Sequence, residues 1–168
     1  MRKQIVLTIA ILLTLSASAQ KDSVVNVPPY KKFPFFPPAK LLLSDSITTF
    51  TKADLDKKKA VMVMVFNPDC GHCQHETEAI LQNIDSFANV QIVMATFMPI
   101  ASVRSFIEKY ELNKYKNIVV TQDPQYFLPT FYMVGNLPFL AFYNKKKELI
   151  SVFEGSMPID KVLIELAK

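Results

Sequence analysis

The sequence predicts an α/β fold in which a mixed central sheet is flanked by helices and preceded by an N-terminal β-hairpin. Apolar runs of strand length alternate along the chain with segments of helical periodicity, as they do in βαβ units. The last two apolar runs are separated only by the polar turn 144–147, which predicts an antiparallel hairpin. The length of 168 residues suits one domain of ordinary size.

The first half of this domain is expected to be a hairpin followed by a βαβ unit. Apolar residues at both ends of 41–50 flank a polar turn, and Thr51 to Asp54 has the spacing of a capped helical turn. Ala60 to Phe66 is a short, continuous apolar run with β-branched residues, which is typical of a buried strand. We expect a helix over 71–87 and a second buried strand over 90–97.

The second half adds three helices and three strands. Apolar residues within 103–110 recur at the spacing of an amphipathic helix. Asp123-Pro124 is expected to begin a short helix that Pro129 stops, and the last helix should begin near 156–158. The strands of this half are expected over 117–121, 139–143 and 148–153.

Residues 1–19 have the features of a secretory signal peptide. Arg2-Lys3 precedes an apolar run of 11 residues, 5–15, and Ala17-Ser18-Ala19 supplies the small residues of a cleavage site. The run is shorter than the ~20 residues that span a bilayer. We expect cleavage before Gln20 and export to the periplasm or another extracytoplasmic space, with an uncleaved membrane anchor as the alternative.

Residues 20–40 are expected to form an arm ahead of a domain at 41–168. Five of the 11 prolines lie in this stretch, with Tyr and Phe side chains between them. Because proline lacks an N–H and fixes φ, the arm should be extended, without a helix. Packing on its own domain is favoured over binding to a partner.

Composition excludes several classes of function. Without Arg2 and Lys3 the cationic residues number 17 against 15 acidic ones, which gives +2 and no argument for nucleic-acid binding. Two cysteines exclude a multi-bridge disulfide scaffold and a four-cysteine zinc site. With three glycines, the chain has no glycine-rich loop for a nucleotide cofactor.

Both cysteines and both histidines lie within six residues, 70–75, between a predicted strand and a predicted helix. Free N–H groups at a helix N-terminus stabilise a thiolate, and a spacing of three places both sulfurs within reach of a disulfide. We expect Cys70 to be the nucleophile and Cys73 the resolving thiol. His72 should stabilise the Cys70 thiolate, whereas the negative charge of Asp69 should oppose it.

The segment from Val63 to Glu76 (VMVFNPDCGHCQHE) resembles the active-site segment of the TlpA-like extracytoplasmic thioredoxins. This resemblance, which extends over roughly 41–167, implies a thioredoxin-like fold and thiol–disulfide oxidoreductase activity toward protein substrates. It also implies a separate redox partner that recharges the pair, and a monomer is expected. Cys70-Gly71-His72-Cys73 is similar to the tetrapeptide of protein disulfide isomerases, which implies an oxidising poise.

Further site residues follow only from this resemblance. Leu137-Pro138 corresponds to the cis-proline position of the family, where the backbone of the preceding residue pairs with an extended substrate. Glu76 matches an acid common in the group and implies a proton relay, with a solvent-facing acid in the first helical turn as the alternative. The chain has Asp69 and Met64 where thioredoxins proper have Trp and a buried Asp, which leaves the proton acceptor open.

Two other functions stay open. Peroxiredoxin-like proteins share the architecture, but they carry a hydroxyl residue three positions before the reactive cysteine, where this chain has Asn67. A chaperone module for copper(I) or another soft metal would use the Cys and His side chains of 70–75. Four ligands within six residues do not readily surround one tetrahedral ion, so we predict no metal and no cofactor.

Overall fold

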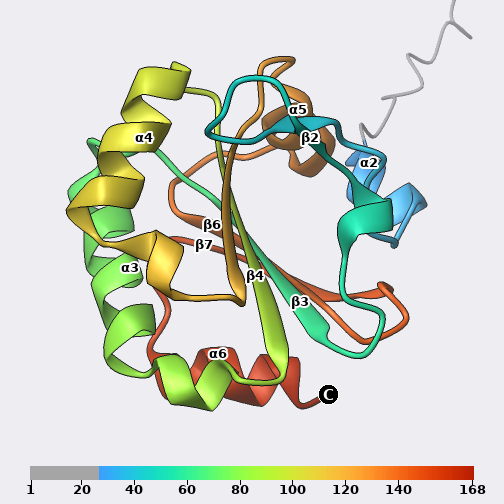
Figure 1. The fold of residues 1–168 in the computed structure, drawn as a ribbon. Coiled ribbons are helices and arrows are strands. Elements are labelled where there is room, and N and C mark those ends of the chain that lie inside the picture. The colour runs from blue at the N-terminus through green and yellow to red at the C-terminus, as the bar shows by residue number, and fades with distance from the viewer. Residues whose placement is uncertain (1–26) are drawn as a thin grey trace, which may run out of the picture.

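A seven-stranded mixed sheet forms the centre of the computed structural model, which describes residues 27–168 (Figure 1). Its strand order is β2-β1-β5-β4-β3-β6-β7. β3, β4 and β5 run parallel, whereas β6 is antiparallel to β3 and to β7. The strands are β1 (Leu41–Leu42), β2 (Thr49–Phe50), β3 (Ala60–Val65), β4 (Val90–Thr96), β5 (Ile118–Gln122), β6 (Phe139–Tyr143) and β7 (Leu149–Glu154). The predicted mixed sheet with a leading hairpin is confirmed.

Helices cover both faces of this sheet, α3, α4 and α6 on one and α2 and α5 on the other (Figure 1). The helices are α2 (Pro29–Lys32), α3 (Gly71–Gln82), α4 (Ile100–Lys109), α5 (Phe127–Tyr132) and α6 (Ile159–Leu166). Alternate residues of β3 point to opposite faces of the sheet. Met62 and Met64 pack in the core under α3 and α4, whereas Val61 and Val63 pack in the core under α5. Since every position of β3 is buried, its sequence is continuously apolar.

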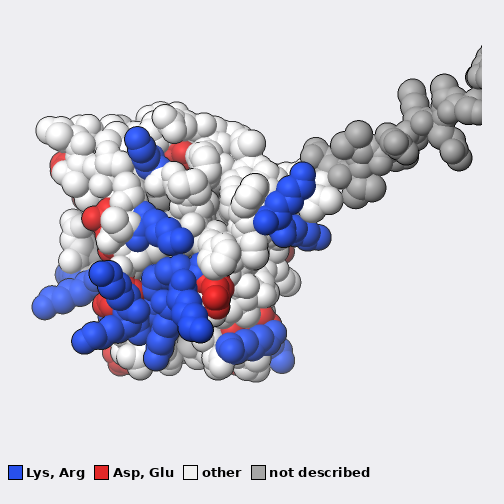
Figure 2. Space-filling view, turned by 90° about the vertical axis from the view of Figure 1, so that its right-hand side faces the viewer, with Lys and Arg blue, Asp and Glu red and all other residues white. Residues whose placement is uncertain are grey.

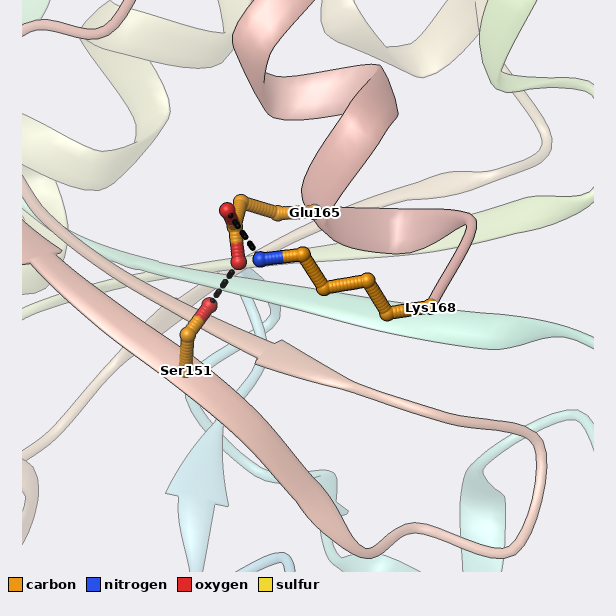
Figure 3. A network of polar contacts seen from close by, with 3 residues as sticks. All are labelled: Ser151, Glu165 and Lys168. Carbon is orange, nitrogen blue, oxygen red and sulfur yellow. Dashed lines mark hydrogen bonds and ion pairs between the residues drawn. The ribbon is translucent and has the colours of Figure 1, made fainter.

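The last helix is fastened to the last strand by a small polar network (Figure 3). The Ser151 hydroxyl of β7 donates to one oxygen of Glu165, and the Lys168 ammonium donates to the other oxygen at 2.7 Å. The hydrogen bonds from Lys168 and Ser151 lower the pKa of Glu165. Val162, the fully buried residue of α6, packs in the core cluster under the sheet and adds an apolar contact to this network.

Two helix boundaries differ from the prediction. The helix predicted over 71–87 ends at Gln82, and a 3₁₀ turn, η3 (Ile84–Phe87), follows it. Asn83 separates them because its side chain donates to the Ala79 carbonyl at 2.9 Å and competes with the helical ladder. The α5 helix begins at Phe127 rather than Pro124, and Asp123 accepts the Leu128 N–H at 2.7 Å.

Pro129 does not stop the α5 helix, as the sequence suggested, but lies inside its first turn. The N–H groups of a first helical turn have no intrahelical acceptor, so a proline there removes no helical hydrogen bond. The helix ends instead at Tyr132, where Met133 adopts a left-handed conformation with φ 53°.

The described part of the arm is not purely extended, which corrects the prediction. It contains the single helical turn α2, whose first residue is a proline, a position that needs no N–H. The arm then runs beside the end of the β6–β7 hairpin. The Phe36 N–H donates to the Lys147 carbonyl at 2.9 Å, and the Leu149 N–H donates to the Pro34 carbonyl at 2.8 Å. The arm therefore packs on its own domain, as favoured above.

The predicted signal peptide, and residues 20–26 of the predicted arm, lie outside the described residues. Across 27–168 no helix has both the length and the apolar character needed to cross a membrane.

Candidate active site

The segment between β3 and α3 is a rigid turn that places Cys70 at the N-cap of the helix. The Cys70 N–H donates to the Asn67 carbonyl at 3.0 Å, and the Asn67 side chain accepts the Asp69 N–H at 2.9 Å. The Gln74 amide group donates to the Pro68 carbonyl at 2.8 Å, which ties the turn to the first helical turn. The nucleophile predicted from the sequence therefore stands on a fixed element.

The two thiols have opposite environments. Cys70 is partly exposed, whereas Cys73, one turn further along α3, is fully buried. Partial burial alone would raise the pKa of Cys70. Hydrogen bonds from the Cys73 N–H, the Cys73 thiol and the His72 N–H outweigh it, and the pKa of Cys70 is lowered. Cys70 is thus the thiol that more readily becomes a thiolate.

Burial dominates the environment of the second thiol. It raises the pKa of Cys73 to about 12, and the nearby Cys70 and Glu76 add to the rise. At neutral pH Cys73 therefore holds its proton, and a base must remove this proton before the sulfur can attack a mixed disulfide.

Glu76 is buried and close to that proton. Its side chain is 1% exposed, so the solvent-facing alternative is wrong. One oxygen, Oε2, accepts the Met157 N–H at 2.9 Å, and Oε1 has no hydrogen-bond partner among the described residues. Burial raises the pKa of Glu76, although the Met157 N–H and His75 oppose the rise. A buried carboxyl with one free oxygen and a raised pKa is suited to accept and release a proton.

His72 affects the Cys70 thiol through its backbone N–H group. Its N–H is one of the donors to the Cys70 sulfur, and its carbonyl accepts the Ser156 hydroxyl at 3.1 Å, while the side chain is exposed. From the sequence, the His72 imidazole was expected to stabilise the Cys70 thiolate. The hydrogen bonds that lower the pKa of Cys70 come instead from backbone N–H groups and the second thiol.

This assignment leads to a test with two variants. His72→Pro removes the donor N–H at a helix position that tolerates proline, so the pKa of Cys70 should rise. A hydrogen bond to a charged group contributes roughly 1.5–3 kcal/mol, so alkylation of Cys70 at pH 6 should slow about tenfold or more. His72→Ala keeps the N–H and is the matched control. An equal effect of both variants would assign the role to the imidazole.

The second part of the site is the loop before β6. The Leu137-Pro138 peptide bond is cis, as the family resemblance implied. Pro138 is buried, and the half-buried Leu137 packs against the same core cluster as Cys70. The structure thus brings together all six predicted site residues, four on α3 or at its start and two on this loop.

The segment Glu154–Met157 was not predicted as part of the site, yet it contacts each part of it. The Glu154 carboxylate accepts the Gly135 N–H at 3.1 Å and the Asn136 amide at 3.0 Å. The Gly155 N–H donates to the Pro138 carbonyl at 2.8 Å. Ser156 and Met157 bind His72 and Glu76 as described above. The only sequence signal was Gly155 after the last strand, and it has a left-handed φ of 95°.

A cleft of about 350 Å³ opens beside the nucleophile, between the start of α3 and the exposed side of α4. Charged and hydroxyl side chains are prominent in its lining, which consists of Pro68, Asp69, Gln74, Ala101, Ser102, Ser105, Phe106 and Lys109. This cleft offers polar contacts to a chain that approaches Cys70. In the part of the chain that the structure covers, no three His, Cys, Asp or Glu side chains gather as metal ligands.

Solved structures with this fold include disulfide oxidoreductases. The DsbF protein of MTB has 20% identity and a TM-score of 0.65, with 77% of this chain and 93% of that chain covered. A secreted Mycobacterium tuberculosis disulfide oxidoreductase homologous to E. coli DsbE has 19% identity and a TM-score of 0.63, with 77% and 95% covered. These likenesses show a thioredoxin-like fold.

A peroxiredoxin-like protein from Aquifex aeolicus shares the same fold, with 15% identity, a TM-score of 0.62, and 79% of this chain and 84% of that chain covered. No curated protein matches the chain. The AhpC/TSA family matches residues 34–155, a range that contains the cysteine pair, the cis-proline loop and the whole sheet. The protein is therefore a thioredoxin-like member of the AhpC/TSA family.

Proposed function

We propose that the protein is an exported thiol–disulfide oxidoreductase of the TlpA-like type, which exchanges disulfides with protein substrates through Cys70 and Cys73. The observation that carries this proposal is the opposite shift of the two thiol pKa values, lowered at Cys70 and raised to about 12 at Cys73. A reactive first thiol and a protonated second thiol are the arrangement that a two-step exchange needs.

In the reducing direction, the Cys70 thiolate attacks one sulfur of a substrate disulfide, and the other substrate sulfur leaves as a thiolate that takes up a proton. Cys73 then transfers its proton to Glu76 and attacks the Cys70 sulfur. The products are a Cys70–Cys73 disulfide and a substrate dithiol. Each step is reversible, so a redox partner that reduces or reoxidises the pair sets the net direction.

The residues around the pair have supporting roles in this proposal. The half-buried Leu137 offers backbone groups to an extended substrate, and Glu154 holds the preceding loop in place through Gly135 and Asn136. The His72 N–H stabilises the Cys70 thiolate. The polar cleft between α3 and α4 receives the part of the substrate that follows its cysteine.

Export rests on the sequence of residues 1–19, with a mature chain that starts at Gln20, an arm over 20–40 and the thioredoxin-like domain over 41–168. One of the similar structures is that of a secreted disulfide oxidoreductase, which fits an extracytoplasmic location. An oxidising compartment is also where protein disulfides persist as substrates.

Peroxidase activity is the second candidate, because the AhpC/TSA family and the similarity to a peroxiredoxin-like structure favour it. In that reaction the Cys70 thiolate would attack a peroxide oxygen and become a sulfenic acid. Cys73 would then condense with it to a disulfide and release water. Asn67 stands where a hydroxyl side chain would help to bind the peroxide, which ranks this reaction second.

One experiment separates the two candidates. The reduced protein is mixed with insulin or with hydrogen peroxide at the same concentration, and formation of the Cys70–Cys73 disulfide is followed by quenching and alkylation. We expect oxidation by the protein disulfide to be at least about 100-fold faster, because the first thiol is arranged for sulfur exchange. Faster oxidation by peroxide would contradict the proposal and establish the peroxidase reaction.

A further inference from the structure

Lysines gather on the side of the molecule that carries α2 and the β6–β7 turn. Figure 2 looks onto this side, where Lys and Arg form a broad cluster with few acidic residues among them. We call this surface the lysine face; it comprises Lys31, Lys32, Lys52, Lys57, Lys58, Lys59, Lys145 and Lys146. All are exposed except Lys59, which is partly buried, and none has an ion-pair partner among residues 27–168.

A buried lysine holds two lysine-rich turns of this face together. The Lys147 ammonium donates to the carbonyl oxygens of Asp56 and Lys59, each at 2.6 Å, so the β2–β3 turn lies against the β6–β7 turn. Two acidic side chains lie in these turns: Glu148 binds the Asn144 amide at 2.8 Å, and the exposed Asp56 accepts the Lys58 N–H at 2.8 Å. The contacts of Lys147 therefore keep the lysines of the two turns close together.

Exposed aromatic rings of the arm and of the start of α5 continue the lysine face. Phe33 is 65% exposed, Phe35 is 49% exposed and Tyr126 is 52% exposed, and all three line an apolar groove of about 750 Å³. The Lys52 ammonium lies 5.7 Å from the centre of the Phe35 ring, and Phe35 is bridged to Glu148 beside the lysine turns. Large apolar side chains exposed together mark a surface that is covered by a partner.

From this combination we propose that the lysine face and the aromatic groove dock the protein on an anionic phospholipid bilayer. Lysines near such a surface are attracted to lipid headgroups, and aromatic rings between them insert at the level of the headgroups. An acidic protein with apolar side chains is the competing partner, and the test below separates it from a bilayer.

The position of the N-terminus supports a bilayer as the partner. The described chain begins at Val27, two residues before α2, and so emerges beside this face. If the apolar run 5–15 is retained as an anchor, which is the alternative to cleavage, it would enter the bilayer on this side. The helix α3, which carries the two cysteines, covers the opposite face of the sheet, so docking leaves Cys70 accessible (Figure 1).

The test is co-sedimentation of the exported protein, recovered after signal removal, with phosphatidylcholine vesicles that contain or lack 30% phosphatidylglycerol. We expect binding to the anionic vesicles alone, weakened as salt rises. Lys58→Glu/Lys145→Glu should reduce the partition coefficient by about tenfold or more. The matched control is Lys109→Glu/Lys161→Glu, on α4 and α6, which changes the net charge equally and should bind like the parent.

A second variant separates insertion from charge. Phe33→Ser/Phe35→Ser changes two exposed rings and no charge, and it should weaken binding severalfold even at low salt. Absence of binding, equal binding to neutral and anionic vesicles, or an equal loss in the control variant would overturn the proposal. Binding to immobilised polyglutamate but not to vesicles would also overturn it and would assign the face to an acidic protein.

Discussion

Cys73→Ser is expected to accumulate mixed disulfides between Cys70 and protein substrates, whereas Cys70→Ser should accumulate almost none. Cys70 is partly exposed with a lowered pKa, so it forms the first covalent bond. Cys73 is buried, and with a pKa of about 12 only about one molecule in 10⁵ carries its thiolate at pH 7. Without Cys73 the intermediate cannot be resolved inside the molecule and persists.

The measurement is the amount of substrate retained by each variant under non-reducing conditions and released by dithiothreitol. We expect Cys70→Ser to lose disulfide exchange by about a thousandfold or more, as removal of a covalent nucleophile does. The double variant Cys70→Ser/Cys73→Ser serves as the background. Equal trapping by both single variants would show that either thiol can attack and would reverse the assignment made from burial.

The sheet could be predicted from the sequence because its central strands are buried on both sides. β3 and β4 have no exposed position, so β3 is a continuous apolar run and β4 is interrupted only by Gln91 and ends at Thr96. The turn between β6 and β7 is marked by four polar residues. The cysteine pair was equally visible, since its spacing and its place after a strand are local features. In the buried strands and at the cysteine pair, the local sequence pattern indicates the same structure that the tertiary contacts favour.

The features that escaped prediction depend on contacts between distant segments. Nothing in the local sequence around Glu76 indicates burial, but Met157, from the loop after β7, donates its N–H to this carboxyl, and Glu76 is buried. The helix break at Asn83 results from one side-chain hydrogen bond, which the apolar periodicity of 71–87 does not encode. Neither the burial of a carboxyl nor a side-chain bond to a carbonyl leaves a periodic signal in the sequence.

Sequence analysis did not predict Glu154–Met157 as part of the site because the residues that this segment contacts are distant from it in the sequence. Its four residues contact the cis-proline loop, the His72 carbonyl and the Glu76 carboxyl through hydrogen bonds of 2.8–3.1 Å. Two of these bonds are donated by the segment's own backbone N–H groups, those of Gly155 and Met157, which every residue except proline offers. At these two positions the contact places little constraint on side-chain identity, and the partners of Glu154 and Ser156 are distant in sequence.

Glu76→Gln should make the protein more stable at pH 7.5 and slower to resolve mixed disulfides. Because the pKa of Glu76 is raised by burial, the folded state favours the protonated form, and this preference stabilises the protein fully below pH 4.5. The stabilisation is lost as pH rises through the folded pKa, where an ionised carboxylate with one unpaired oxygen must stay buried. Gln cannot ionise, so the variant does not lose this stability as pH rises.

Urea unfolding at two pH values measures the first effect. The free energy of unfolding of the variant should exceed that of the parent by about 1 kcal/mol at pH 7.5 and should match it near pH 4. Glu78→Gln, on the exposed side of the same helix, is the matched control and should change neither value. A variant less stable than the parent at pH 7.5 would show that the carboxylate is stabilised by contacts other than the Met157 N–H.

The second effect is kinetic and tests the role of Glu76 as the base. With Gln at this position no carboxylate accepts the Cys73 proton, so release of substrate from the mixed disulfide should slow by about 100-fold, the lower range for loss of a general base. Formation of the mixed disulfide depends on Cys70 and should keep its rate. Removal of the negative charge also lowers the pKa of Cys73, because Glu76 contributes to its rise, so hydroxide can partly replace the base at high pH. The rate deficit of the variant should therefore shrink between pH 7 and pH 9.5, and a deficit that stays constant over this range would exclude Glu76 as the proton acceptor.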